Sequence, residues 1–197
     1  MQSRTRSIVL SGLCIALLAA GAAIILPFGP IPFTLQSLML MLIVLILTPK
    51  EAAVAVGGYL LLGAIGLPVF AGFAGGFGVL LGPTGGFLVG FFIGALLSAL
   101  LRSALRPRLT GRRSAIALDV ASVLIVIVVY DALGMLWFMH ITGSTLMTSI
   151  TLSVLPFLGP DIIKAFAAFT CAQPIRAALG RGTPIKLQKE AKRESTE

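Results

Sequence analysis

Two residues near the start of the last apolar run have types and spacing that could bind a charged ligand. Asp161 and Lys164 stand three positions apart, so on a helix they share one face and can approach each other. Pro160 fits the first turn of a helix, and Asp161 would then lie near the positive end of the helix dipole. The pair could hold a ligand carboxylate on the ammonium and ligand N–H donors on the carboxylate, or it could be a structural ion pair.

The segment 66–87, rich in glycine and phenylalanine, is the second candidate. It is too glycine-rich for a lipid-facing helix and too apolar for a solvated loop. At membrane depth, irregular backbone survives only where it is buried in protein or lines a cavity. We expect either a loop that merely caps the bundle or a wall for a ligand with a flat polar ring and an apolar tail. Its candidate ligand contacts are Phe73, Gly75, Thr84, Gly85, Gly86 and Phe87.

Polar residues elsewhere add to this picture. Gln36 follows a proline-rich connection at 27–32 and could reach the same cavity. Asp131 lies deep in an apolar run, as part of a proton path or as an acid hydrogen-bonded within the bundle. Asp119 lies near the mouth of the same run and is expected to face Arg112 and Arg113.

Small residues at helical spacing near the N-terminus form a third pattern. Gly12, Ala16 and Ala20 stand four positions apart, and such a stripe lets another helix approach closely. The approaching helix can belong to this chain or to a separate subunit. Internal packing is the commoner use of such a stripe.

The elements that position these residues must lie in a membrane. Hydrophobic residues make up 57% of the 197 and charged residues 11%, against roughly 25% charged residues in soluble domains. We therefore predict an all-α integral membrane protein, with a transmembrane domain at 1–180 and a polar cytoplasmic tail at 181–197. Apolar runs predict six transmembrane helices, the second and third short enough to need tilt or a thinner bilayer. The six runs are 8–26, 32–47, 51–67, 85–105, 114–138 and 156–179.

Charge sets the expected orientation. Every lysine and arginine except Lys164 stands in a group that flanks an apolar run, and the connections 27–34, 68–84 and 139–155 hold none. This alternation is the positive-inside pattern, which places both termini in the cytoplasm. The net charge of +8 therefore indicates a lipid bilayer rather than a nucleic acid. We expect the first run to be a retained helix rather than a signal peptide, because it is long enough to span the membrane.

Several functions are excluded by what the sequence lacks. It contains no G-x-x-x-x-G-K-[ST] phosphate loop, no H-E-x-x-H motif and a single histidine, so we expect neither an enzyme nor a metal site. Two further classes of function stay open. One is a self-sufficient secondary transporter or channel for a small anionic solute, for which Asp131 would be essential. The other is a non-transporting membrane scaffold subunit.

Four blocks of the sequence together resemble the BioY family, the biotin-binding S component of energy-coupling-factor (ECF) transporters. They are 31–36 (IPFTLQ), 66–70 (GLPVF), 81–87 (LGPTGGF) with Gly90, and the Asp161–Lys164 pair. The resemblance implies a six-helix S-component bundle in the prokaryotic plasma membrane, with biotin captured near the outer face. Biotin would be the transported ligand, and no cofactor is implied.

The resemblance also implies partners and residue roles. It implies a membrane coupling (T) subunit, docked on Ala16 and Ala20, and two cytoplasmic ATPase subunits. Asp161 and Lys164 would contact biotin. Some members of the family also use an asparagine and an arginine between the third and fourth spans, and this chain has neither there. Backbone groups, Thr84 or Gln36 would then supply those polar contacts.

Overall fold

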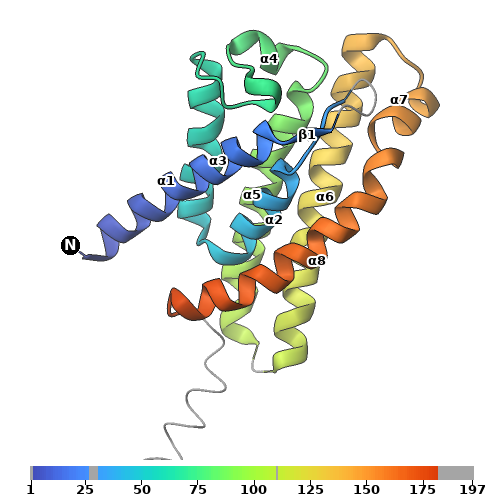
Figure 1. Cartoon of the computed structure of the whole chain (residues 1–197). Coiled ribbons are helices and arrows are strands. Elements are labelled where there is room, and N and C mark those ends of the chain that lie inside the picture. The colour runs from blue at the N-terminus through green and yellow to red at the C-terminus, as the bar shows by residue number, and fades with distance from the viewer. Residues whose placement is uncertain (1, 27–30, 110, 182–197) are drawn as a thin grey trace, which may run out of the picture.

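The computed structural model describes residues 2–26, 31–109 and 111–181, and within them the chain is almost wholly helical (Figure 1). Its long helices are α1 (Gln2–Ala23), α2 (Gln36–Ile46), α3 (Pro49–Ala64), α5 (Gly85–Leu105), α6 (Arg112–Thr142) and α8 (Leu155–Ala178). Shorter helical turns join them, namely η1 (Ala71–Phe73), α4 (Phe77–Leu81), η2 (Arg106–Arg108) and α7 (Leu146–Ser153). Strands β1 (Ile25–Leu26) and β2 (Phe33–Thr34) pair antiparallel between α1 and α2.

Four stretches among the described residues are long and apolar enough to cross a membrane. They are Arg4–Ala23, Gly85–Arg108, Arg113–Thr142 and Leu146–Ala178. Helices also occupy the second and third predicted spans, but α2 has 11 residues and α3 has 16. Eleven residues of helix extend about 16 Å, roughly half of the hydrocarbon thickness. The all-helical class is therefore confirmed, while the number of six spans stays a prediction.

Helix α2 is the central helix of the bundle. Its residues from Leu40 to Ile46 are all buried, as expected for a helix that is apolar on every side. It packs against α1, α8, α5 and α6. A short helix in this position brings the polar residues of its first turn into the interior.

Helix boundaries differ from the predicted ones at two places that bear on function. Helix α1 ends at Ala23 because Ile25 and Leu26 enter the β-pair; the proline-rich connection after them lies outside the described residues from 27 to 30. Helix α8 begins at Leu155, with Pro156 in its first turn. The prediction that Pro160 opens this helix is wrong, and Asp161 lies beyond the first turn.

Helix α5 lies against α6 along a stripe of small residues. Gly86, Gly90, Gly94 and Ser98 recur every four positions, which lets the two helix backbones approach closely. A Cβ atom on Gly90 would lie 2.6 Å from the Cα atom of Tyr130. Further along the stripe, the Ser98 hydroxyl donates to the carbonyl of Ser122 over 2.9 Å. The stripe therefore fixes the position of Tyr130 relative to α5.

The two ends of the bundle differ in what they carry. Figure 1 shows β1, α4 and α7 towards one end and the α5–α6 connection at the other. The first turns of α1 and the end of α8 meet at a contact in which Arg6 Nη2 donates to the Leu179 carbonyl over 2.5 Å. The two described ends of the chain therefore lie side by side.

Candidate ligand-binding site

A cavity of about 230 Å³ lies between the first turn of α2, the segment from η1 to α5, and the inner faces of α6 and α8. Its apolar wall includes Ile31, Phe70, Phe87, Phe91 and Phe157. Its polar groups come from Thr34, Gln36, Ser37, Thr84, Tyr130, Asp131, Asp161 and Lys164. A mostly apolar pocket with a few convergent polar groups is typical of a small-molecule site.

The ion pair of Asp161 and Lys164 lies in the wall of this cavity. Lys164 Nζ is 3.1 Å from Asp161 Oδ1, and both residues are buried, with 6% and 3% of their surface exposed. Their positions on α8, three residues apart, bring the charges together as the sequence predicted. An ammonium buried at this depth is tolerated because it is paired.

Two hydroxyl groups form hydrogen bonds with the ion pair. Lys164 Nζ donates to Ser37 Oγ over 2.8 Å, and Ser37 Oγ lies 3.2 Å from Asp161 Oδ1. The Tyr130 hydroxyl donates to Asp161 Oδ2. Lys164 Nζ also lies 4.0 Å from the centre of the Phe33 ring, close enough for a cation–π interaction. The pair thus ties α8 to α2 and α6.

Asp131 is a second carboxylate on the cavity wall. It is buried on α6, next to Tyr130. Its Oδ1 atom has no hydrogen-bond partner within the described part of the chain. A buried acceptor in this state is costly unless something donates to it, so Asp131 Oδ1 is ready to accept a hydrogen bond from a ligand.

Gln36 anchors the glycine-rich segment. Its Nε2 atom donates to the Tyr59 hydroxyl over 2.9 Å, and that hydroxyl donates to the Val69 carbonyl over 2.9 Å. Phe70 packs edge-on against Tyr59, with ring centres 5.5 Å apart. Phe70 also occupies the space at Gly63, where a Cβ atom would lie 2.0 Å from the ring. Hydrogen bonds and packing therefore hold this part of the segment against α2 and α3, where it lines the cavity.

The predicted ligand contacts fall into two groups. Gln36, Thr84, Phe87, Asp161 and Lys164 line the cavity. The other four, which are outside its lining in this structure, are Phe73, Gly75, Gly85 and Gly86. Contact of any of these residues with a ligand stays a prediction.

The residues of the second group differ in their surroundings. Phe73 is 68% exposed and has a φ of 57°, a conformation uncommon outside glycine. A Cβ atom on Gly75 would lie 2.4 Å from the Leu67 carbonyl oxygen, and one on Gly85 would lie 1.8 Å from that of Leu80. Gly86 packs closely against Trp137. The three glycines therefore allow close approach of backbone or side chains.

Several cavity residues were not identified from the sequence. Ser37, Tyr130, Phe91 and Phe157 all line it. The four-residue stripe of small residues on α5 could have indicated that α6, and with it Tyr130, packs against this wall. No comparable signal marks Ser37 or Phe157, because their position depends on where α2 and α8 cross.

The small-residue stripe on α1 lies on the outside of the bundle. Ala16 and Ala20 are exposed, and a Cβ atom on Gly12 would meet nothing within 4 Å. The opposite face of the helix carries Cys14 and Leu18, which are buried. Within the described residues, the stripe is thus not used to pack helices of this chain together.

Comparison with known proteins gives a consistent result. The model of the BioY family matches residues 1–181. The chain is 35% identical over 173 residues to the probable biotin transporter BioY of Pyrococcus horikoshii, covering 88% of this chain and 98% of that protein. It is 35% identical over 193 residues to the biotin transporter BioY of Rhodobacter capsulatus, with coverage of 90% and 99%.

A solved structure shares the fold. It is the crystal structure of the S-component for biotin from an ECF-type ABC transporter. It superposes on this chain with a TM-score of 0.79 at 26% sequence identity, covering 89% of this chain and 93% of that one.

Proposed function

Because the chain belongs to the BioY family, we propose that it is the substrate-specific S component of a biotin importer. It is a multi-pass integral membrane protein of a prokaryotic membrane, and its family is one of transporters rather than enzymes. The protein captures biotin at the outer face of the membrane and delivers it with an ATP-driven ECF module. The observation that carries this function is the buried Lys164–Asp161 pair in the wall of an apolar cavity.

The chemistry of biotin fits that cavity. Its carboxylate is a partner for the Lys164 ammonium, and its ureido N–H groups are donors for the carboxylates of Asp161 and Asp131. Its thioether ring and alkyl chain suit the phenylalanine side chains of the wall. Charge-assisted hydrogen bonds contribute roughly 1.5–3 kcal/mol each. Two or three of them, together with burial of the rings, support binding in the nanomolar range, about −12 kcal/mol.

Our proposal includes the topology. Six helices cross the membrane, with both termini in the cytoplasm, and the short α2 and α3 cross with tilt or a locally thinner bilayer. The contact between Arg6 and Leu179 supports this, because it places the two described ends of the chain on one side. Residues 1–180 then form the substrate-binding domain; the proposed tail at 181–197 lies outside the described residues from 182 onward.

The proposal also includes the partners. A membrane coupling subunit docks on Ala16 and Ala20 of α1, and two cytoplasmic ATPase subunits supply the energy. Support comes from the exposure of this stripe on a helix whose other face is buried. Small residues that are left exposed on a membrane helix are suited to close contact with a helix of another subunit.

Calorimetry on the purified protein in detergent tests the function. Biotin should bind with a nanomolar dissociation constant, and the neutral biotin amide should bind at least about tenfold more weakly, because it cannot pair with Lys164. Absence of biotin binding would contradict the function. Equal affinity for the acid and the amide would leave the function standing but contradict the role of Lys164.

A further inference from the structure

A second cavity, of about 180 Å³, lies at the end of the bundle away from the ligand site. Asp161 and Arg176 mark the two sites on α8, and they stand fifteen positions apart, about 22 Å along the helix. The turn between α2 and α3 and the ends of α5 and α8 form the walls of the second cavity. Its lining includes four arginines and, among the described residues, no acidic one; the arginines are Arg102, Arg106, Arg176 and Arg181.

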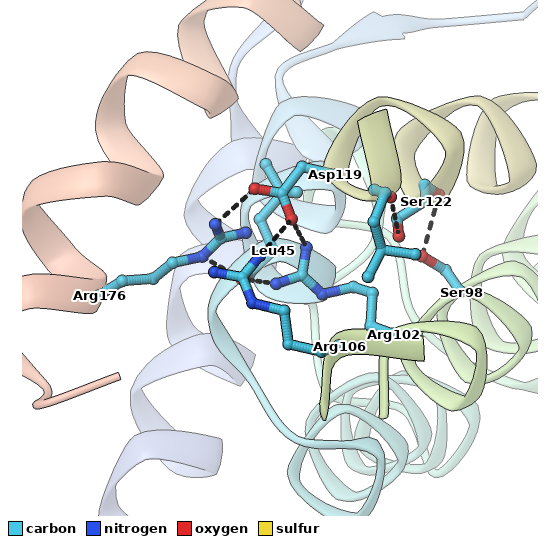
Figure 2. Close-up of polar contacts among 8 residues, drawn as sticks. Leu45, Ser98, Arg102, Arg106, Asp119, Ser122 and Arg176 are labelled. Atoms are coloured by element: carbon cyan, nitrogen blue, oxygen red, sulfur yellow. Dashed lines mark hydrogen bonds and ion pairs between the residues drawn. The ribbon is translucent and has the colours of Figure 1, made fainter. Parts of the chain in front are cut away.

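Asp119 on α6 is a buried carboxylate that pairs with three of these arginines (Figure 2). Its Oδ1 atom accepts from Arg102 over 2.5 Å and lies 3.8 Å from Arg106. Its Oδ2 atom accepts from Arg176 over 2.5 Å. The partners that the structure describes for Asp119 thus come from α5, η2 and α8; the side chain of Arg112, one of the two predicted partners, lies outside the described part of the chain.

Backbone carbonyls at the end of α2 take part as well. The Leu45 carbonyl accepts from Arg102 over 2.9 Å and from Arg176 over 2.6 Å. The Ile46 carbonyl accepts from Arg181 over 3.0 Å, and Glu51 accepts from the same guanidinium over 2.7 Å. Each of these acceptors already receives at least one hydrogen bond from an arginine of the pocket.

Arg176 has one donor atom that these acceptors do not satisfy. Arg176 is 4% exposed, and its Nη2 atom is buried without a hydrogen-bond partner in the described part of the chain. Leaving a buried, charged N–H group unsatisfied is costly. A group that entered the cavity with several acceptor oxygens and a negative charge would remove that cost.

We propose that this arginine pocket binds a phosphate group, and that the group belongs to an anionic phospholipid of the cytoplasmic leaflet. Phosphate matches the fork geometry of several guanidinium groups at once. Basic pockets between membrane helices on the cytoplasmic side are suited to lipid head groups, and the orientation proposed above places this end of the bundle there. A free phosphate ion has the same chemistry and is distinguished by experiment.

The test measures the melting temperature of the full-length protein in detergent micelles with phosphatidylglycerol, phosphatidylcholine or inorganic phosphate added. Phosphatidylglycerol should raise the melting temperature by about 3 °C or more, and phosphatidylcholine should not. In the double variant Arg106→Gln/Arg181→Gln this rise should disappear. These two arginines are chosen because Arg102 and Arg176 also hold the helices together through Asp119.

The double variant Arg108→Gln/Arg113→Gln is the matched control. Both arginines are exposed and outside the pocket lining, so this variant loses the same charge and should keep the rise. An equal rise in both double variants would overturn the proposal, because it would indicate only attraction to a basic surface. No rise with phosphatidylglycerol or phosphate in the wild-type protein would also overturn it.

The remaining results identify the source of the phosphate. A rise with phosphatidylglycerol alone, lost in the pocket variant, supports the lipid. A rise with inorganic phosphate alone would overturn the lipid and leave a soluble phosphate compound as the ligand. Biotin binding, measured on the same samples, shows that each variant is folded. Because that measurement concerns the other cavity, failure of the phosphate proposal is distinguishable from failure of the proposed transport function.

Discussion

Lys164 has two of its hydrogen-bonding partners in place before any ligand is bound. Its ammonium donates to Ser37 and lies against Asp161, which leaves donor capacity for one more acceptor. Both oxygens of Asp161 already accept hydrogen bonds, whereas Asp131 Oδ1 accepts none from the described residues. Lys164 can thus donate one more hydrogen bond to an anionic ligand. Asp131 has more capacity than Asp161 to accept a hydrogen bond from one.

Substitution of the charged pair tests this at single residues. Lys164→Gln and Asp161→Asn should each weaken biotin binding by at least about tenfold, since a charge-assisted bond contributes roughly 1.5–3 kcal/mol and a factor of ten corresponds to about 1.4 kcal/mol. The measurement is calorimetry with biotin. Circular dichroism of each variant checks that the helices persist.

The matched control is Lys50→Gln. Lys50 is exposed in the first turn of α3 and outside the cavity lining, so its loss should leave the affinity unchanged. The double variant Asp161→Asn/Lys164→Gln removes both charges and leaves no unpaired buried ion. It should fold and still bind weakly. Wild-type affinity for biotin in both single variants would show that the pair is not part of the binding site.

Asp131→Asn tests the second acceptor. Its amide keeps one oxygen but loses the charge, so affinity for biotin should fall by about tenfold while uptake at saturating biotin persists. Calorimetry and uptake of labelled biotin by cells measure the two effects. Loss of uptake with unchanged affinity would instead assign Asp131 to a proton path, as expected of a secondary transporter.

At the scale of helices, the contact between α5 and α6 links stability to binding. Gly90 lies against the backbone of Tyr130, and Tyr130 donates to Asp161. A larger side chain at position 90 must therefore move α6 and with it a group that holds the ion pair.

Gly90→Leu should lower the melting temperature by about 5 °C or more and weaken biotin binding, because overpacking at a tight helix contact is destabilising. Thermal unfolding and calorimetry on the same preparation measure both effects. The control is Gly159→Leu on α8, where a Cβ atom would meet nothing within 4 Å and no loss is expected. Equal melting temperatures for the two variants would contradict the close α5–α6 contact.

How far these helices could be predicted depended on whether the signal was local. The apolar runs located all six long helices. In lipid, the backbone N–H and C=O groups of such a run must be hydrogen-bonded within the run, and a helix does this. The run at 156–179 located the start of α8 to within one residue. Pro160 was nevertheless wrongly placed in the first turn, because Pro156 and Pro160 both fit that position and only packing decides between them. Likewise η1 and α4 could not be predicted from a segment whose glycines permit many conformations.

Prediction of the site followed the same division. Asp161 and Lys164 could be paired from their spacing on one helix. Ser37 and Tyr130 complete the pair from 124 and 31 residues away, and contacts at such separation leave no trace in one sequence. The pairing of Asp119 with Arg176 could not be predicted for the same reason, since Arg176 lies 57 residues away.

At the scale of the whole molecule, our proposal assigns the capture of biotin to the interior of the bundle and the docking of the partner to the outside of α1. The cavity lies inside the bundle, whereas Ala16 and Ala20 are exposed on α1. On the proposed function, binding needs only this chain, and uptake needs a partner on that stripe. This separation predicts variants that lose transport without losing affinity.

Ala16→Trp should leave biotin affinity unchanged but abolish both uptake and co-purification with the coupling subunit, because an indole prevents close helix approach. The control Ala132→Trp places the same side chain on an exposed position of α6 and should retain both. Uptake by the wild-type chain should also require co-expressed coupling and ATPase subunits. Transport by the chain alone, or full uptake by Ala16→Trp, would contradict this division and favour a self-sufficient transporter, since a helix that never docks tolerates a large side chain on its lipid-facing surface.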